Sequence, residues 1–239
     1  MSIERIIDSI SEYANVKQVM RPVASVGILA LGHTVELAKL GDALGLIPTE
    51  HDKNGKVVWD IKASGAVHLE GQPVARSHTS EEFNWHTDAS FEPIPPQYFM
   101  LQVLQADAMG GGVQSFIQVS NVIAELPEDV RATLTETEFI WKVPPEFQRS
   151  ETSRHLPLLF GTNEGDLAFR YRRECIDLGC ATMEQLYALE CFEAMIRRAP
   201  QIRHTPAAGE LAVVDNWRAL HKRSEIKDRR RHLQRVRFQ

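Results

Sequence analysis

The sequence predicts a mainly β protein with appended helices, in which two sheets form a jelly roll. Short strand-like segments separated by glycine and proline turns run through most of its 239 residues. Helical patterns gather instead at the start, over about 1–48, and in an insertion at about 182–198. A chain of this length with 43% apolar residues can bury a sizeable core, so we expect a single domain over 1–239.

The first half of the chain alternates between the two patterns. Isoleucines at helical spacing predict a helix over 2–19, and an amphipathic run that stops at Gly45 predicts another over 34–44. A loop is expected over 62–80, a turn at the glycines 110–112 and a helix over 120–134. Strands are expected at 23–31, 57–61, around residue 86, at 98–105 and at 113–119.

The second half repeats this alternation and contains the best-defined helix. Thr182 is a typical N-cap, and Pro200 lies just beyond the last helical residue, so we expect a helix over 182–198. Strands are expected at 138–143, 156–159, 168–172, 211–215 and 233–238.

Composition narrows the class of protein. The net charge of −5 argues against a nucleic-acid partner, and no apolar run approaches the length of a membrane span. Three cysteines without a C-x-x-C pair predict reduced thiols. The N-terminal segment lacks the apolar core of a signal peptide. We therefore expect a cytoplasmic protein with a small-molecule partner. The sequence does not indicate its oligomeric state.

The segment Trp85-His86-Thr87-Asp88 is the most informative motif. In an extended strand, alternate residues point to the same face, so His86 and Asp88 could direct an imidazole and a carboxylate at one point. Together with a third ligand from His221, they would form the two-histidine, one-carboxylate set that binds ferrous iron and leaves positions open.

The spacing alone is weak evidence. With nine histidines and 32 acidic residues, about one such triplet is expected by chance, and a second one occurs at His68-Leu69-Glu70. That triplet lies among glycines and a proline and is typical of a loop, whereas His86 lies in an aromatic, strand-like segment before a proline-rich turn. The context therefore favours His86 and Asp88.

Four segments in order resemble the taurine dioxygenase and clavaminate synthase group of Fe(II)/2-oxoglutarate-dependent oxygenases. They are WHTDASFEPIPPQY, LQADAMGGGVQSF, GELAVVDNWRALHKR and RRRHLQRVRF. The resemblance implies a double-stranded β-helix core, with iron held by His86, Asp88 and His221. It also implies that 2-oxoglutarate and O2 are cosubstrates, and that the protein oxidises an unactivated C–H bond with release of succinate and CO2.

The resemblance also implies that an arginine fourteen residues after the distal histidine binds 2-oxoglutarate, and Arg235 lies at that distance from His221. A guanidinium suits this role because it pairs with a carboxylate through two hydrogen bonds and stays charged. Arg231 could assist. Where the family often has a threonine after the glycine turn, this chain has Gln114 as a candidate replacement.

Substrate contacts are predicted less directly. The resemblance implies a small substrate, and an arginine in the pocket would suit an amino acid or another carboxylate. Hydroxylation, desaturation and ring closure all stay open. The candidate residues are Phe83, Asn84, Tyr98, Arg170, Arg172 and Arg218. For each one taken alone, the sequence favours core packing or a surface ion pair over a substrate contact.

Three other functions remain to be weighed. The basic tail over 222–237 could bind nucleic acid, although it alternates with apolar residues as a strand does. A jelly roll with a degenerate site could act as a binding or scaffold protein. A metal oxygenase that needs no 2-oxoglutarate is the third, and Arg235 distinguishes it from the main hypothesis.

Overall fold

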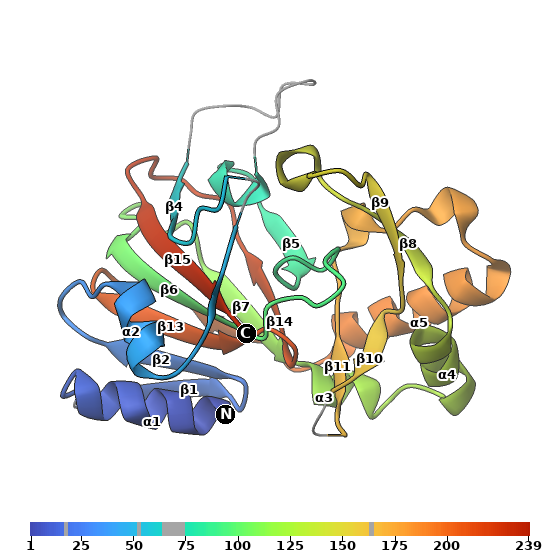
Figure 1. Cartoon of the computed structure of the whole chain (residues 1–239), viewed down its shortest axis with the longest axis horizontal. Coiled ribbons are helices and arrows are strands. Elements are labelled where there is room, and N and C mark those ends of the chain that lie inside the picture. Colours follow the sequence, from blue (N-terminus) through green and yellow to red (C-terminus); the bar gives the residue numbers. More distant parts are fainter. Residues whose placement is uncertain (17–18, 52–53, 64–74, 163–164) are drawn as a thin grey trace.

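Two antiparallel sheets face one another in the computed structural model, with a mixed lobe of helices and hairpins beside them (Figure 1). The structure describes residues 1–16, 19–51, 54–63, 75–162 and 165–239. The predicted mainly β architecture is confirmed. None of the helices in these ranges has the length and apolar character that a membrane crossing needs.

The larger sheet contains both terminal regions of the chain. Its strands run in the order β1-β2-β13-β6-β15-β3, and β4 also pairs with β15. Their bounds are β1 Val19–Val23, β2 Val26–Ala30, β3 Pro48–Thr49, β4 Trp59–Lys62, β6 Tyr98–Gln105, β13 Glu210–Asp215 and β15 His232–Phe238. The closing strand β15 therefore lies next to β6, from the middle of the chain.

The smaller sheet has the order β12-β7-β14-β5. Its strands are β5 Phe83–His86, β7 Gln114–Gln118, β12 Ile202–His204 and β14 Ala219–Arg223. The sheets pack on each other through a small apolar cluster that includes Phe99 and Val214 from the larger sheet and Phe116 from the smaller one. This cluster closes one part of the sandwich, and the polar residues of the candidate site lie beside it.

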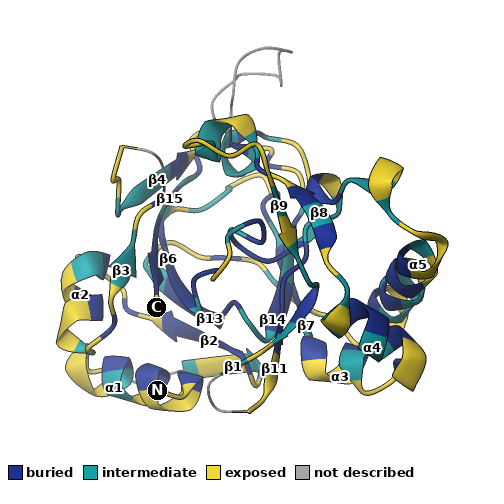
Figure 2. Ribbon diagram, turned by 45° about the vertical axis from the view of Figure 1, so that its right-hand side comes forward, coloured by how far each residue is buried: buried dark blue, intermediate teal, exposed yellow. Residues whose placement is uncertain are grey.

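Helices α1 (Ile3–Tyr13) and α2 (Leu37–Ala43) cover the outer face of the larger sheet. The buried side of α1 is formed by Ile3, Ile6, Ile7 and Ile10. Gly27 on β2 allows the close approach, because a Cβ atom there would lie 2.2 Å from Ile7 Cδ1. Figure 2 shows the resulting pattern, with exposed residues on the outer side of both helices and buried strands behind them.

The neighbouring lobe is formed by three helices and two hairpins around a large apolar cluster that includes Trp141 and Phe192. The elements are α3 Val119–Ile123, α4 Glu128–Glu136, β8 Phe139–Lys142, β9 Ser153–Leu156, β10 Leu159–Gly161, β11 Leu167–Phe169 and α5 Met183–Arg198. Thr182 caps α5 in a capping box with Gln185, as the sequence predicts. Short 3-10 turns lie at Arg76–His78, Pro145–Phe147, Arg173–Cys175 and Leu178–Cys180.

Several expected elements differ in detail. The strand predicted over 23–31 is a hairpin of β1 and β2, and the N-terminal part expected to be helical therefore also supplies two strands. The helix predicted over 120–134 is two helices, because Pro127 cannot continue a helix and instead precedes α4. The strand expected over 156–159 is the end of β9 and the start of β10. His68-Leu69-Glu70 lies outside the described residues.

Candidate metal centre

His86 and His221 are brought together by strand pairing between β5 and β14. His86 is the last residue of β5, and the antiparallel register places it directly opposite His221. Their ring centroids are 4.2 Å apart. Residues separated by 135 positions in the chain thus become neighbours because directly paired residues in a sheet place their side chains close together.

Asp88 reaches the same point from a turn. The strand ends at His86, so the prediction that both ligands share the face of one extended strand is wrong in its geometry. Asn216 holds the turn in place: its Oδ1 accepts from Asp88 N at 2.7 Å, and its Nδ2 donates to Asp88 O at 3.0 Å and to Pro96 O at 2.9 Å. Ala89, the next residue, has a φ of 51°. The tight turn, and not the alternation of side chains along a strand, therefore directs the Asp88 carboxylate towards the two histidines.

The three side chains form a compact donor set. One atom from each of His86, Asp88 and His221 lies within 4.8 Å of the others, which is the only such group of three or more potential metal ligands in the described parts of the chain. His86 and Asp88 are buried, and His221 is half-buried. Two histidines and one carboxylate in this arrangement match the chemistry of ferrous sites with open positions.

The protonation states favour metal binding. His86 Nδ1 lies 2.7 Å from Asn84 O, so the Nδ1 proton is donated there and Nε2 keeps its lone pair. Burial, together with the charge of His221, holds the pKa of His86 well below its usual range, so this imidazole is neutral. A neutral imidazole with a fixed tautomer is a ready metal ligand.

Asp88 is ionised for a different reason. Burial alone would raise its pKa, but the positive charge of Arg235, together with the nearby His221 ring, holds the pKa well below the usual range. Arg235 Nη1 lies 2.9 Å from Asp88 Oδ1, while Asp88 Oδ2 is buried and has no hydrogen-bond partner among the described residues. A buried carboxylate oxygen without a partner is costly unless a cation binds it, so the residues fit a metal ion.

A cavity with about 590 Å³ of unfilled space, including solvent at its mouth, extends from this cluster between the two sheets. Its walls include His86 and His221 at one side and the apolar side chains of Leu101 and Phe116. Three arginines and one amide also line it, namely Arg223, Arg231, Arg235 and Gln114. The predicted 2-oxoglutarate residues therefore share one cavity with the candidate metal ligands.

Arg231 is the most deeply placed of these arginines. Its side chain is 3% exposed, and its Nη1 has no hydrogen-bond partner among the described residues. Gly112 makes room for it, because a Cβ atom there would lie 2.9 Å from Arg231 Nε. Burial and the nearby charge of Arg223 lower the pKa of Arg231 to about 9. An anionic ligand would compensate this buried charge.

The substrate candidates are distributed over several places. Phe83 stacks on His86 with ring centroids 3.5 Å apart and lines the cavity. Asn84 is exposed and supplies its backbone oxygen to His86. Arg172 lies near the site, since its backbone bridges to that of His86.

Tyr98, Arg170 and Arg218 are placed in structural roles instead. Tyr98 is buried against the helical layer and its hydroxyl donates to Met1 O. The Arg170 guanidinium donates to backbone oxygens of the proline-rich turn, including Pro93 O at 3.0 Å. Arg218 forms ion pairs with Asp166 at 2.8 Å and Asp215 at 2.9 Å. As substrate contacts these three predictions are not supported, because the sequence could not indicate to which face each side chain belongs.

Three residues of the site were missed. Arg223 follows His221 by two positions and Arg237 follows Arg235 by two, so strand alternation could have placed both on the site's face. The sequence does not indicate a role for Asn216, because an Asp-Asn pair after a strand is also typical of an ordinary turn.

Comparison with known proteins agrees with this geometry. The sequence model of the taurine catabolism dioxygenase TauD, TfdA family matches residues 32–237. The chain belongs to the TauD/TfdA family. The match covers the larger sheet from β3 onwards, the smaller sheet and the neighbouring lobe, and it confirms the resemblance found in the sequence motifs.

Among curated proteins, this TauD/TfdA chain is 28% identical over 210 residues to L-asparagine oxygenase of Streptomyces coelicolor. The alignment covers 86% of this chain and 58% of the relative. A solved asparagine oxygenase in complex with Fe(II), 2S,3S-3-hydroxyasparagine and succinate superposes with a TM-score of 0.67 at 28% identity. The superposition covers 84% of this chain and 63% of the solved asparagine oxygenase. This chain therefore spans less than two thirds of the length of the curated relative and of the solved relative.

Two more distant TauD/TfdA-like structures share the fold. The oxygenase OrfP in complex with Fe, succinate and (3S)-hydroxy-L-Arg has a TM-score of 0.66 at 22% identity, covering 85% of this chain and 63% of OrfP. A taurine dioxygenase from Burkholderia xenovorans has a TM-score of 0.59 at 19% identity, covering 82% and 69% of the two chains.

Proposed function

We propose that this protein is a non-haem Fe(II)- and 2-oxoglutarate-dependent oxygenase that oxidises a C–H bond of a small amino acid. The observation that carries the proposal is the cluster of His86, Asp88 and His221 at the wall of a cavity that is also lined by the guanidinium groups of three buried arginines. Family membership and the iron, succinate and hydroxyamino-acid complexes of asparagine oxygenase and OrfP support it.

In this proposal His86, Asp88 and His221 hold ferrous iron. When bound, iron with 2-oxoglutarate and O2 supplies an oxidant for an unactivated C–H bond and yields succinate and CO2. The chain's own contribution is positioning and exclusion of water. Asn216 fixes the Asp88 turn, Asn84 O orients the His86 ring, and Phe83 covers one face of that ring.

In this proposal Arg231 and Arg235 have different roles in 2-oxoglutarate binding from those expected from the sequence. Arg231 lies deep in the cavity, and none of the residues that the structure describes is a hydrogen-bond partner of its Nη1. Gln114 lines the same cavity, so we assign the far carboxylate to these two residues. Arg235 pairs with Asp88 and therefore lies beside the metal cluster. In this proposal its guanidinium acts near the iron rather than at the far end of the cosubstrate.

The finer features of the reaction are also proposals. The product is a hydroxylated amino acid, with desaturation or ring closure as alternatives that use the same oxidant. The partner is a small molecule, with no role for nucleic acid or a membrane. We place the protein in the cytoplasm, consistent with free Cys175, Cys180 and Cys191.

The first test is anaerobic titration of the Fe(II)-loaded protein with 2-oxoglutarate, followed through the weak visible metal-to-ligand charge-transfer band. We expect the band to appear in the natural protein and to be lost in Asp88→Ala and His221→Ala. If protein that demonstrably contains iron gives no band, the keto acid does not chelate the metal, and a metal oxygenase without 2-oxoglutarate or a scaffold protein would be favoured.

A second test separates the two arginines. Arg231→Gln should weaken 2-oxoglutarate binding by about 10- to 100-fold, the range expected for losing a charge-assisted pair of hydrogen bonds. Arg235→Gln should change this affinity less. Arg229→Gln is the matched control, because Arg229 belongs to the same basic tail but is exposed. If Arg235→Gln weakens 2-oxoglutarate binding more than Arg231→Gln does, Arg235 and not Arg231 binds the far carboxylate.

A further inference from the structure

A second, smaller cavity lies beside the metal cluster, and its unfilled space of about 350 Å³ includes open solvent. It shares His86, Asp88 and Arg235 with the candidate site. Its other walls include the turn after β5, Phe147 and Arg237 on β15. A molecule held there would lie against the metal ligands without entering the deep cavity assigned to 2-oxoglutarate.

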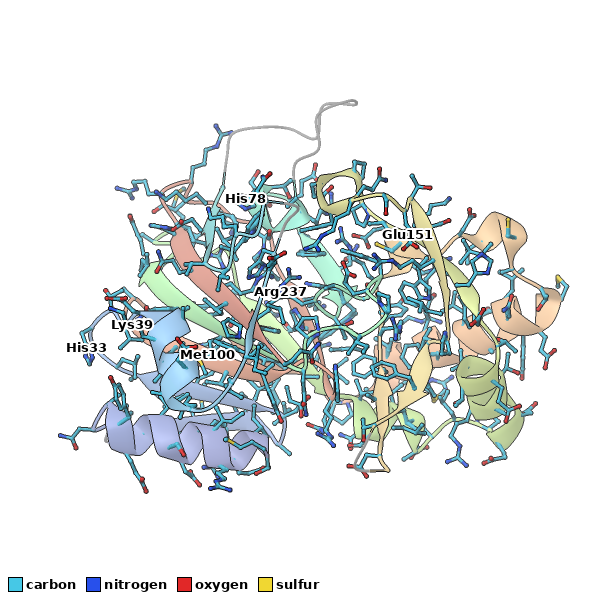
Figure 3. The ribbon with its side chains drawn as sticks, viewed as in Figure 1. His33, Lys39, His78, Met100, Glu151 and Arg237 are labelled. Carbon is cyan, nitrogen blue, oxygen red and sulfur yellow. The ribbon has the colours of Figure 1, made fainter. Side chains whose placement is uncertain are left out.

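Arg237 gives this cavity a buried positive charge. Figure 3 labels Arg237 near the centre of the molecule, between the larger sheet and the lobe. The side chain is 5% exposed, its Nη2 donates to Glu50 O at 2.9 Å, and its Nε has no hydrogen-bond partner among the described residues. Burial lowers the pKa of Arg237 to about 10, with Arg235 adding to the effect, although Asp88 opposes it.

Arg172, from the segment between β11 and the 3-10 turn at Arg173–Cys175, brings a second guanidinium to the same cavity. Its backbone bridges to that of His86, and its guanidinium carbon lies 5.1 Å from the centre of the Phe83 ring. Phe83 in turn stacks on His86, so the same ring contacts both the candidate metal ligand and the arginine. Its Nε pairs with Glu174 at 2.9 Å, and the side chain is 11% exposed.

Arg237 gives this cavity an excess of positive charge. Four arginines line it, namely Arg76, Arg172, Arg235 and Arg237, and Asp88 is the only carboxylate among its described lining residues. The first three arginines form ion pairs with Glu81, Glu174 and Asp88, respectively, whereas Arg237 forms none with a described residue. A buried cation without an ionic partner is costly, and carboxylates are the natural two-pronged partners of guanidinium.

The apolar walls define the other part of a ligand. Phe83, Phe91 and Phe147 line the same cavity, and the rings of Phe91 and Phe147 are stacked with centroids 5.4 Å apart. Such walls suit a short aliphatic segment, which carries the C–H bond to be oxidised, between charged ends.

We propose that this second cavity seats the substrate and that the substrate is an amino acid whose side chain ends in a carboxylate. Arg172 and Arg237 each take one carboxylate, and the aliphatic carbon atoms lie against the phenylalanine walls beside the metal cluster. This inference rests on the proposed function, because it assigns the substrate class of that same site. It distinguishes this chain from its relatives crystallised with hydroxyasparagine and hydroxyarginine, whose side chains are neutral and cationic.

The experiment compares ligands of equal size and different charge. Anaerobic protein loaded with Fe(II) and 2-oxoglutarate is titrated with L-aspartate, L-asparagine, L-glutamate and L-glutamine, and the shift of the charge-transfer band reports binding beside the metal. We expect at least one acid to bind about tenfold or more tightly than its own amide, because only the acid forms charge-assisted hydrogen bonds to both arginines.

Variants locate the effect in the cavity. Arg172→Gln should reduce the preference for the acid severalfold and leave the 2-oxoglutarate band unchanged. Arg173→Gln is the matched control, because Arg173 pairs with Glu193 at 2.7 Å instead of lining the cavity. Arg237→Lys, which keeps the buried charge but loses the two-pronged geometry, should weaken acid binding without preventing folding.

Amides that bind as tightly as the acids, or failure of both acids to bind while the 2-oxoglutarate band is present, would overturn the inference and leave the proposed function intact. Absence of the band itself would instead count against the proposed function. A loss of acid preference in Arg173→Gln equal to that in Arg172→Gln would show that the preference does not come from this cavity.

Discussion

Individual side chains in this protein are placed by backbone contacts that reach across long distances in the chain. Asn216 is the clearest case, since its amide binds both the N–H and the C=O of Asp88 and is fully buried. One residue therefore determines where the candidate carboxylate ligand points. The same device fixes the proline-rich turn through Pro96 O.

Asn216→Ala should lower the affinity for ferrous iron by about tenfold or more, because a buried group that loses its partner costs roughly 1–3 kcal/mol. Iron binding measured under anaerobic conditions checks this expectation, and circular dichroism checks the fold. Gln148→Ala is a suitable control, since Gln148 also donates from its amide to a backbone oxygen, Val143 O, but lies in the lobe. Unchanged iron affinity in Asn216→Ala would show that the turn positions Asp88 without the Asn216 side chain.

His51 makes the stability of the folded chain depend on pH. Burial and the charges of Arg237 and Arg235 place the pKa of His51 far below its usual value of 6.5. The unfolded chain takes up a proton below about pH 6.5 whereas the folded chain does not, so stability is fully present above this pH and falls as the pH decreases further. We expect a loss of up to about 1.4 kcal/mol per pH unit from this residue.

Urea unfolding at pH 7, 6 and 5 measures this slope. His51→Gln should reduce the dependence of the unfolding free energy on pH, because about one proton fewer is taken up on unfolding than in the natural protein. An equal slope in the variant would mean that His51 takes up no proton on unfolding in this range.

At the scale of elements, the glycine turn before β7 and the segment before β15 are packed backbone to backbone. Gly112 N donates to Glu225 O at 2.8 Å. A Cβ atom on Gly111 would lie 2.6 Å from Lys227 N and 2.7 Å from Glu225 O, so no side chain can be accommodated without moving the chain. The segment that moves leads directly to Arg231.

Gly111→Ala should therefore weaken 2-oxoglutarate binding severalfold and destabilise the protein, although Gly111 contacts no ligand in our proposal. Gly161→Ala is the matched control, because no atom lies within 4 Å of its added Cβ. Thermal unfolding and the 2-oxoglutarate titration, carried out on both variants, test the expectation. Equal affinities in the two variants would contradict the coupling between the turn and Arg231.

The elements also show what local sequence could and could not predict. The strand Tyr98–Gln105 and the helix ending at Arg198 agree with expectation, because a continuous apolar run and a capping box are local signals. The position of Asp88 in a turn was not predictable, since it depends on Asn216, 128 residues later. The orientations of Tyr98, Arg170 and Arg218 likewise depend on which parts of the fold pack against each of these residues.

At the scale of the whole molecule, the candidate site combines residues from both sheets. His86 and His221 belong to the smaller sheet, whereas Arg231 and Arg235 come from the closing strand of the larger sheet or the segment just before it. The cluster of Phe99, Phe116 and Val214 holds the two sheets together beside this site. That the whole chain behaves as one domain stays a prediction.

A ligand that binds both sheets should stabilise the whole fold. With Fe(II) and 2-oxoglutarate present at about 100 times their dissociation constants, we expect a stabilisation of about 2.7 kcal/mol for each independent site. Differential scanning calorimetry under anaerobic conditions measures it. Asp88→Ala should abolish the shift with iron, and a shift that persists in this variant would indicate that iron binds elsewhere.

The carboxylate of Asp88 can serve two cations at the same time. The Arg235 guanidinium occupies Oδ1, whereas Oδ2 is buried without a hydrogen-bond partner among the described residues and is open to a divalent ion. An arriving metal would therefore add its charge next to a resident guanidinium at the edge of both cavities. Two adjacent positive charges attract a carboxylate more strongly than one, so we expect the order of assembly to be metal first and acidic ligands afterwards.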